Sequence, residues 1–348
     1  MRAALLEEPG RVVVADVPEP VIVDPRDVIV DIRFAGVCGS DLWPYRGLVA
    51  KTPGSTSGHE FLGVVRELGA EVRGLAVGDA VIAPFLFSDG DCEACGRGLT
   101  SLCARGGMWG KDAGGGQAER IRVPFGDATL VRLPWAADEL DGALARALMP
   151  VTDVFATGTH GATLAEIADG DAVVVIGDGA VGISAGIAAR RQGAGSVLVV
   201  GENPARLAVA SDYGLDVLLT HRGDDAVGSV LASTGGRRPD RVIECVGVEA
   251  SFATGLELVR DGGRMSFVGV PHGVTPIAPM RLFARQISLV GGVAPARHYL
   301  PGLVEEVRSG VLDLAPLVEA EYALSEVADA YAAMDSGEAL KVILDVSR

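Results

Sequence analysis

The stretch "DAVVVIGDGAVGISAGIAARRQ", residues 171–192, decides the fold of this chain. Its β-branched run "AVVVI" predicts a buried strand, and the Ala- and Ile-rich segment after the glycines predicts a helix. The glycines have the spacing GxGxxG, which allows a tight turn, close approach of a pyrophosphate and close helix packing, with the helix N-terminus facing the anion. The stretch therefore predicts a dinucleotide-binding turn formed by Gly177, Gly179, Ala180, Val181 and Gly182.

The alternation of strands and helices continues on the C-terminal side of this turn. The strand-like segments are "SVLVVG", "DVLLT", "RVIECVG" and "GRMSFVGV", and the segment "PARLAVASDYG" is helix-like. Strands that alternate with helices of about a dozen residues are typical of a parallel, doubly wound sheet. We therefore expect an α/β domain in this part of the chain.

The choice between NAD and NADP stays open in the sequence. The second strand ends at Gly201, where a carboxylate would bind the adenosine ribose of NAD and repel the extra phosphate of NADP. Gly201 lacks that carboxylate, but the next residue is Glu202. Arg206 or Arg222 could instead bind the phosphate, although an arginine in these places is more often part of a solvated helix face.

The region before this domain has a different pattern. From about residue 11 to 131, segments such as "RVVVADV" and "DVIVDIRFAGV" are rich in Val and Ile and are separated by Pro, Gly and Asp turns, which predicts a mostly β domain. "DELDGALARALM" then predicts a helix. The C-terminal segments "HYLPGLVEEVRSG" and "SEVADAYAAMDSGEALKVILDV" predict two helices and a closing strand.

The composition is that of a globular protein and disfavours several partners. The 348 residues are 49% hydrophobic and 22% charged, with a formal charge of -16 and no cluster of Lys or Arg. Nucleic acid or an anionic membrane would therefore be a poor partner. The start "MRAALLEEPG" meets acidic residues too early for a signal peptide, and five cysteines, an odd number, favour metal binding over disulfides. We expect a cytoplasmic protein.

Two short segments contain zinc-type ligands. "GVCGSDLW" holds Cys38, Ser40 and Asp41, and "SGHEFLG" holds His59 and Glu60. A thiolate and an imidazole at adjacent strand ends would make half of a zinc site. Taken alone, the two residues could equally be a buried cysteine and a hydrogen-bonded core histidine.

A third segment, "SDGDCEACGRGLTSLC" at residues 88–103, holds three of the five cysteines. A zinc site made from protein alone needs four ligands. The stretch is therefore a candidate metal site with an open fourth position.

Taken together, these segments resemble the zinc-dependent medium-chain alcohol dehydrogenases. The resemblance covers essentially the whole chain and is carried by "GVCGSDL", "GHEFLGVV", "DCEACGRGLTSLC", "GGGQAE", "VVVIGDGAVG", "IECVG" and "FVGV". It implies a GroES-like β-rich catalytic domain made of residues 1–153 and 295–348, and a Rossmann domain at residues 154–294. It also implies hydride transfer between NAD or NADP and an alcohol, aldehyde or ketone, in a homodimer or homotetramer.

The resemblance assigns roles to particular residues. It implies a catalytic zinc held by Cys38, His59 and Asp153, with Glu60 as a further ligand when water or substrate leaves. Asp41 would orient the histidine, and the Ser40 hydroxyl would touch the substrate oxygen and pass its proton onward. Besides the glycine-rich turn, the implied cofactor-binding residues are Gly201, Glu202, Arg206, Val246, Val268 and Lys341.

The family's structural zinc lobe is spaced C-x2-C-x2-C-x7-C, and three positions before Cys92 this chain has Asp89. The resemblance therefore implies a second zinc, held by Asp89, Cys92, Cys95 and Cys103. The alternative is a lobe that has lost its metal, in which Asp89 caps a turn.

The chain departs from the family at Trp43, where many members have a histidine that completes a proton relay. The proton would then leave another way, such as from Ser40 through the cofactor ribose to water. Trp43 also suggests a bulky pocket wall shared with Trp109 and Phe85 or Phe87, unless these aromatic residues belong to the core. A zinc-free quinone or enoyl reductase and a non-catalytic cofactor-binding protein are the alternative functions.

Overall fold

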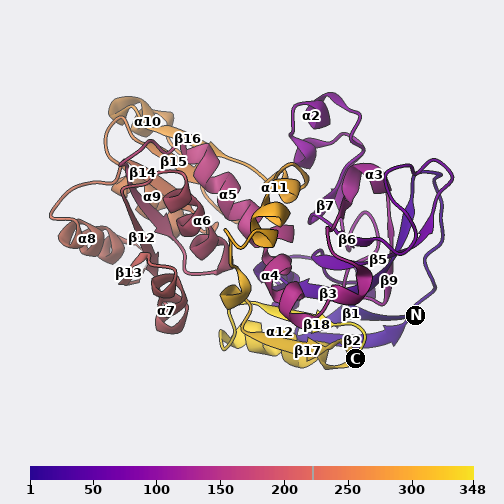
Figure 1. Cartoon of the computed structure of the whole chain (residues 1–348). Helices are drawn as coiled ribbons and strands as arrows, with labels where there is room; N and C mark the ends of the chain where they lie inside the picture. The colour runs from indigo at the N-terminus through magenta and orange to yellow at the C-terminus, as the bar shows by residue number, and fades with distance from the viewer. Residues whose placement is uncertain (222) are drawn as a thin grey trace. The chain divides into compact units, whose positions relative to one another are not determined.

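The computed structural model describes residues 1–221 and 223–348 (Figure 1). The chain forms two compact units. Unit 1 comprises Met1–Asp153 and Pro295–Arg348, and unit 2 comprises Val154–Ala294. Within the described residues, no helix combines the length and apolar character needed to cross a membrane.

Unit 2 is built on one parallel sheet, ordered β13-β12-β11-β14-β15-β16. All five strand pairs are parallel, and the first strand of unit 2, β11, lies inside the sheet between β12 and β14. The predicted doubly wound α/β fold is therefore confirmed. The strands are β11 (Ala172–Ile176), β12 (Ser196–Gly201), β13 (Asp216–Leu219), β14 (Arg241–Glu244), β15 (Arg264–Phe267) and β16 (Ser288–Gly291).

The helices of unit 2 cover its sheet, and its core is a cluster of buried aliphatic and aromatic side chains around β11, β12 and β14 (Figure 1). The sequence pattern predicted α6 and α7 but not the other helices, several of which contain glycines that lower helix propensity. In α5, Gly158 is needed because a Cβ there would overlap the backbone of α6. The helices are α5 (Val154–Ala165), α6 (Ala180–Arg191), α7 (Pro204–Asp212), α8 (Asp224–Ser233), α9 (Glu249–Leu258) and α10 (Pro279–Arg285).

Unit 1 is mostly β, as predicted. Its main sheet runs β10-β6-β5-β3-β18-β17, with β9 also paired to β3, and two smaller sheets run β2-β1-β4 and β7-β8. The strands are β1 (Arg2–Glu8), β2 (Arg11–Asp16), β3 (Val28–Val37), β4 (Ser55–Thr56), β5 (Phe61–Leu68), β6 (Ala80–Ile82), β7 (Leu86–Phe87), β8 (Gly107–Met108), β9 (Arg120–Val123), β10 (Val131–Arg132), β17 (Ala320–Ala323) and β18 (Val342–Asp345).

The C-terminal segment of the chain completes unit 1, because β18 pairs antiparallel with β3. The two helices predicted for this segment are present as α11 and α12, and α12 packs beside β17 and β18. The helix predicted earlier in unit 1 is present as α4. The helices are α1 (Leu42–Tyr45), α2 (Glu93–Gly96), α3 (Gly126–Thr129), α4 (Gly142–Thr152), α11 (Ala296–Arg308) and α12 (Val327–Ser336), with short 3-10 turns at Gly39–Asp41, Thr100–Leu102, Ala137–Glu139, Ala315–Leu317 and Leu324–Glu326.

Candidate active site

The first metal-ligand cluster lies at one end of the main sheet of unit 1. Cys38 follows the last residue of β3, and His59 comes just before β5. These two strands are antiparallel neighbours, with Ala35 opposite Phe61, so the two ligands meet at one edge. Asp153 directly follows α4, which contacts both strands. The structure thus brings together three side chains that are 94 and 115 residues apart in sequence.

The geometry of this cluster fits a metal ion. The Cys38 thiol lies 3.2 Å from Asp153 Oδ2, and His59 Nε2 lies 3.1 Å from the same oxygen. Two ligands bound to one tetrahedral zinc at about 2.0 to 2.3 Å lie roughly 3.5 Å apart. On the other side of the imidazole ring, Nδ1 lies 3.3 Å from Asp41 Oδ1. Asp41 therefore orients His59 so that Nε2 faces the cluster.

Without a metal, this cluster holds its protons tightly. Burial raises the pKa of the Cys38 thiol to about 11, and the nearby Asp153 carboxylate adds to the effect. Burial alone would lower the pKa of His59, but the carboxylates of Asp41 and Asp153 raise it well above its ordinary value. Zinc binds a thiolate and a neutral imidazole, so binding must displace a proton from each of these groups.

Glu60, whose role as a further zinc ligand stays a prediction, is paired with Lys341 in this structure. Its buried carboxylate lies outside the Cys38, His59 and Asp153 cluster, and both oxygens lie 2.7 Å from the Lys341 ammonium. Lys341 was expected to bind the cofactor, and the structure gives it this partner inside unit 1. The pairing of β18 with β3 brings Lys341 close to the end of β3. The physical reason is that a charge buried this deeply needs an opposite charge.

The aromatic residues expected to form a pocket wall belong largely to the core. Trp109 is buried, donates from Nε1 to the Pro84 carbonyl at 2.8 Å, and packs edge-on against Phe61 with 5.2 Å between ring centroids. Phe87 packs against the same indole, and Phe85 is also buried. Trp43 is half-buried.

Ser40, the residue expected to pass on the substrate proton, lies beside the first cluster. Its hydroxyl is exposed and lies 3.4 Å from His59 Nε2. An exposed hydroxyl beside a ligand position can exchange a proton with water, which is the property that a proton relay needs.

The second cluster lies in the lobe that contains α2. One ligand atom from each of four residues lies within 4.8 Å of the others: Asp89, Cys92, Cys95 and Cys103. Tetrahedral sulfur ligands of zinc lie about 3.8 Å apart, so these four donors also fit a zinc ion. Backbone N–H groups of Cys95 and Ala104 lower the pKa of Cys92, which favours the thiolate that a metal requires.

Asp89 both caps a turn and belongs to this cluster. Its Oδ1 accepts N–H bonds from Asp91 at 2.9 Å and Cys92 at 3.1 Å, and its Oδ2 lies 2.7 Å from Arg105 Nε. A carboxylate has about four acceptor positions, so these contacts leave room for a metal. Arg105 was not predicted from the sequence, because no ligand spacing marks an ion-pair partner.

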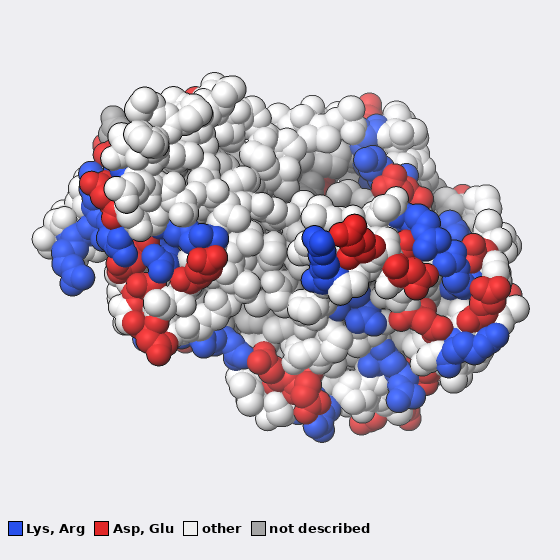
Figure 2. Space-filling view, turned by 90° about the horizontal axis from the view of Figure 1, so that it is seen from above, with Lys and Arg blue, Asp and Glu red and all other residues white. Residues whose placement is uncertain are grey.

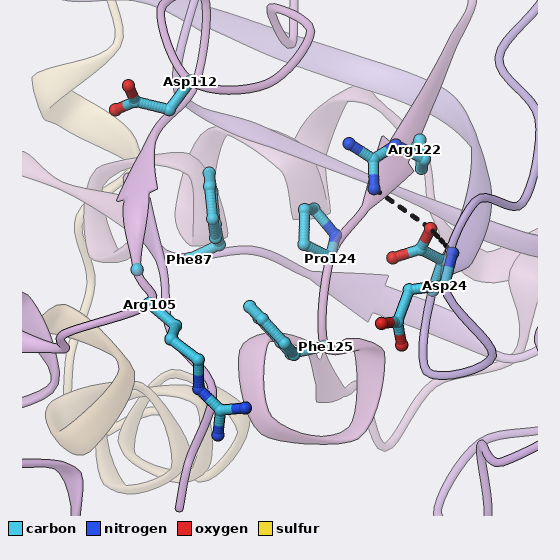
Figure 3. A pocket seen from close by; sticks show the side chains of 9 residues that line it. Asp24, Phe87, Arg105, Asp112, Arg122, Pro124 and Phe125 are labelled. Atoms are coloured by element: carbon cyan, nitrogen blue, oxygen red, sulfur yellow. Dashed lines mark hydrogen bonds and ion pairs between the residues drawn. The ribbon is translucent and has the colours of Figure 1, made fainter. Parts of the chain in front are cut away.

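A separate pocket of about 410 Å³ lies in unit 1 near this lobe. Figure 3 shows Phe87, Pro124 and Phe125 at its centre, with Arg105 and Arg122 on its sides. Arg122 is paired at 3.0 Å with Asp27, a buried lining residue. The lining contains no member of either metal-ligand cluster, so the pocket is distinct from both.

The predicted dinucleotide turn has the expected geometry in unit 2. Gly177 has φ +119°, a conformation that favours glycine. A Cβ at Gly182 would overlap the Gly177 carbonyl, so this glycine permits the close packing of α6 on β11. The space beside Gly179 is open, and this residue caps the N-terminus of α6, whose first residues are Ala180 and Val181.

The remaining cofactor candidates lie at the carboxyl ends of neighbouring strands, where ligands bind in open α/β sheets. Gly201 ends β12, and Glu202 follows it. Val246 and Val268 come shortly after β14 and β15. Arg206, in the first turn of α7, has a buried Nε without a hydrogen-bond partner among the described residues. Arg222 lies outside the described residues.

One residue of this region, Asp178, was not predicted from the sequence. It lies between the first two glycines of the turn and is buried. Its Oδ2 accepts the backbone N–H groups of Glu202 at 2.8 Å and Asn203 at 2.7 Å. An acidic residue at a variable position of GxGxxG was the signal that could have identified it.

Comparison with known proteins agrees with this architecture. Residues 24–134 match the model of the alcohol dehydrogenase GroES-like domain, and residues 180–309 match that of the zinc-binding dehydrogenases. The chain is 35% identical to a probable zinc-binding alcohol dehydrogenase of Mycobacterium tuberculosis, over 99% of this chain and 88% of the relative.

Solved structures show the same likeness. An alcohol dehydrogenase from a Thermus species superposes with a TM-score of 0.90 at 34% identity and covers 99% of both chains. A putative zinc-binding dehydrogenase from Sinorhizobium meliloti, bound to NADP, superposes with a TM-score of 0.83 at 27% identity and covers 99% of this chain and 98% of its own.

A doubly wound nucleotide-binding unit and a β-rich unit with zinc-type ligand clusters define a class of zinc-type oxidoreductases. Within that class, the chain belongs to the zinc-dependent medium-chain alcohol dehydrogenase family. The GroES-like and Rossmann folds that the sequence resemblance implied are therefore confirmed.

Proposed function

We propose that the protein transfers a hydride between NAD or NADP and an alcohol, aldehyde or ketone, with zinc as the catalytic metal. The observation that carries the proposal is the cluster of Cys38, His59 and Asp153, which offers S, N and O donors at metal-binding distances. A zinc-free reductase of the same fold would have no use for these three donors. The two negative charges of a thiolate and a carboxylate also match a divalent ion.

Each residue of the first cluster has a distinct task in this proposal. When bound, zinc supplies a Lewis acid that lowers the pKa of an alcohol oxygen or polarises a carbonyl, and the nicotinamide accepts or donates the hydride. Cys38, His59 and Asp153 would hold the metal, and Asp41 keeps the imidazole in place. Ser40 Oγ would accept the proton of the substrate hydroxyl while its own hydroxyl proton passes to water, so that the serine stays neutral.

We further propose a second zinc in the lobe around α2, held by Asp89 and three cysteines. One donor atom of each of these four residues lies within 4.8 Å of the other three, which is close enough for all four to bind one metal ion. This site is proposed as structural because its four protein ligands leave no open position for a substrate. The role of such a site is to hold the lobe in place.

Removing zinc with a chelator is expected to abolish alcohol-dependent reduction of NAD or NADP, and adding zinc back to restore it. The restored activity should require more zinc as the pH falls. The reason is that both Cys38 and His59 have raised pKa values and hold protons that zinc must displace. Titration of the metal-free protein in buffers of different ionisation enthalpy should show release of about two protons at the first cluster.

Full activity in protein that elemental analysis shows to be free of zinc and of any other metal would contradict the proposal. Zinc binding that is equally tight on both sides of neutral pH would contradict the assignment of Cys38 and His59 as ligands.

We also propose a homodimer formed through one edge of the Rossmann sheet. β16 is an edge strand, and the chain segments before and after it contain the exposed apolar residues Val270, Met280, Phe283 and Val293. Figure 2 shows a largely uncharged surface at the upper left of its view, over unit 2. An edge strand with exposed apolar residues in the chain segments before and after it is suited to pairing with a second copy.

Replacing Phe283 by Glu is expected to convert the dimer into a monomer, because this side chain is 79% exposed in a single chain and a charge there would be buried in the pair. Sedimentation velocity measures the change as a halved mass. Val311→Glu, an exposed apolar residue of unit 1, serves as the control. An unchanged mass for the Phe283 variant would place the interface elsewhere.

A cytoplasmic location is proposed because all five cysteines are free thiols and four of them are placed for metal binding. The proposed partners are a small alcohol or carbonyl substrate and the dinucleotide.

A further inference from the structure

β12 ends at Gly201, which has no side chain, and the Asp178 carboxylate occupies the space that a side chain at this position would fill. A Cβ at Gly201 would overlap the Asp178 side chain at its Cβ, Cγ and Oδ2 atoms. Asp178 belongs to the glycine-rich turn after β11, which is the parallel neighbour of β12. The missing side chain at position 201 and the acid at position 178 therefore depend on each other.

The Asp178 carboxylate is held firmly in this place. The side chain is buried, and its Oδ2 accepts two backbone N–H groups, from Glu202 and Asn203 in the loop that follows β12. Its other oxygen, Oδ1, has no hydrogen-bond partner among the described residues. A carboxylate oxygen in this state can still accept a hydrogen bond from a ligand.

The position of this carboxylate matters for cofactor choice. In dinucleotide-binding sheets, a carboxylate at the end of the second strand accepts a hydrogen bond from the 2′-hydroxyl of the adenosine ribose of NAD. The 2′-phosphate of NADP would be repelled by the negative charge of this carboxylate. We propose that Asp178, which lies in the turn after the first strand β11, replaces the acid that is usual at the end of the second strand. Its carboxylate would make the protein prefer NAD to NADP. This inference rests on the proposed dinucleotide-binding function.

Two other charged residues near the end of β12 do not decide the choice. Glu202 is about one-third exposed, so solvent and dissolved salt weaken the effect of its charge. Arg206 has a buried Nε without a hydrogen-bond partner among the described residues. A guanidinium can donate to ribose hydroxyls as well as to a phosphate, so its presence is compatible with either cofactor.

The test is calorimetric binding of two probes, ADP-ribose and its 2′-phosphate, to the zinc-loaded protein, which requires no turnover. The unchanged protein should bind ADP-ribose at least about tenfold more tightly. Asp178→Asn keeps the shape and an oxygen that can accept the two N–H groups but removes the charge, and should lower this preference by about tenfold. Asp212→Asn, an exposed acid of the same unit, should leave the preference unchanged.

Glu202→Gln separates the two acids near the ribose position and should have a smaller effect than Asp178→Asn. The inference is overturned if the unchanged protein prefers the 2′-phosphate, or if Asp178→Asn behaves like Asp212→Asn while its thermal unfolding midpoint is unchanged. Failure of the unchanged protein to bind either probe would instead overturn the proposed dinucleotide-binding function itself.

Discussion

Replacing Asp153 by Asn is expected to lower kcat/KM by at least about 1,000-fold and to reduce the zinc content from about two ions per chain to about one. The physical reason is the loss of one of only two anionic ligands among Cys38, His59 and Asp153. A neutral amide oxygen is a weaker zinc ligand than a carboxylate. Steady-state kinetics and elemental analysis of the same preparation measure both effects.

Two variants show whether this loss comes from the metal. Asp153→Cys replaces one anionic ligand by another that zinc accepts, so it should keep the zinc and recover a large part of the activity. Asp138→Asn removes one exposed acid of unit 1 and should change neither quantity. If Asp153→Asn kept two zinc ions and full activity, Asp153 would not be a ligand.

The fold was predictable to a large extent because its signals are local. The β-branched runs and the GxGxxG spacing predicted β11 and the start of α6, and the structure has both. The sequence pattern did not predict helices such as α5 and α9. Gly158 of α5 is needed for close contact with the α6 backbone, and Gly255 of α9 lies against the end of the Met265 side chain; both contacts exist only in the folded chain.

The site was predictable where residue type alone carries the chemistry. Cys38, His59 and Asp153 were expected from their types and the family resemblance, and the fold brings them together. The partners of buried charges were not predictable in this way. Lys341 pairs with Glu60 across 281 residues of sequence, and only the pairing of β18 with β3 makes this contact possible.

Replacing Asp89 by Ala is expected to remove one zinc ion and to lower the free energy of unfolding by about 3 kcal/mol or more. The Asp89 side chain is fully buried, and its loss leaves the N–H groups of Asp91 and Cys92 without their acceptor. Its ion pair with Arg105 contributes less, because the arginine is half-exposed. Thermal unfolding and elemental analysis measure the two effects.

Further substitutions separate metal binding from turn capping. Asp89→Asn keeps an oxygen for the two N–H groups but weakens the metal ligand, whereas Asp89→Cys supplies a thiolate ligand but cannot reproduce the turn. If the metal dominates the stability, Asp89→Cys should retain two zinc ions and unfold at the higher temperature of the two. Arg105→Ala is the control for the ion pair and should leave the zinc content unchanged.

The Asp89 variants should spare the chemical step. None of Cys38, His59 and Asp153 belongs to the lobe cluster, so at low temperature, where the variant is folded, kcat should stay within about twofold of the unchanged protein. At higher temperature, activity should be lost together with the lobe. Survival of both zinc ions in Asp89→Ala would show that Asp89 only caps the turn, and a fall in kcat at low temperature would show that the lobe takes part in catalysis.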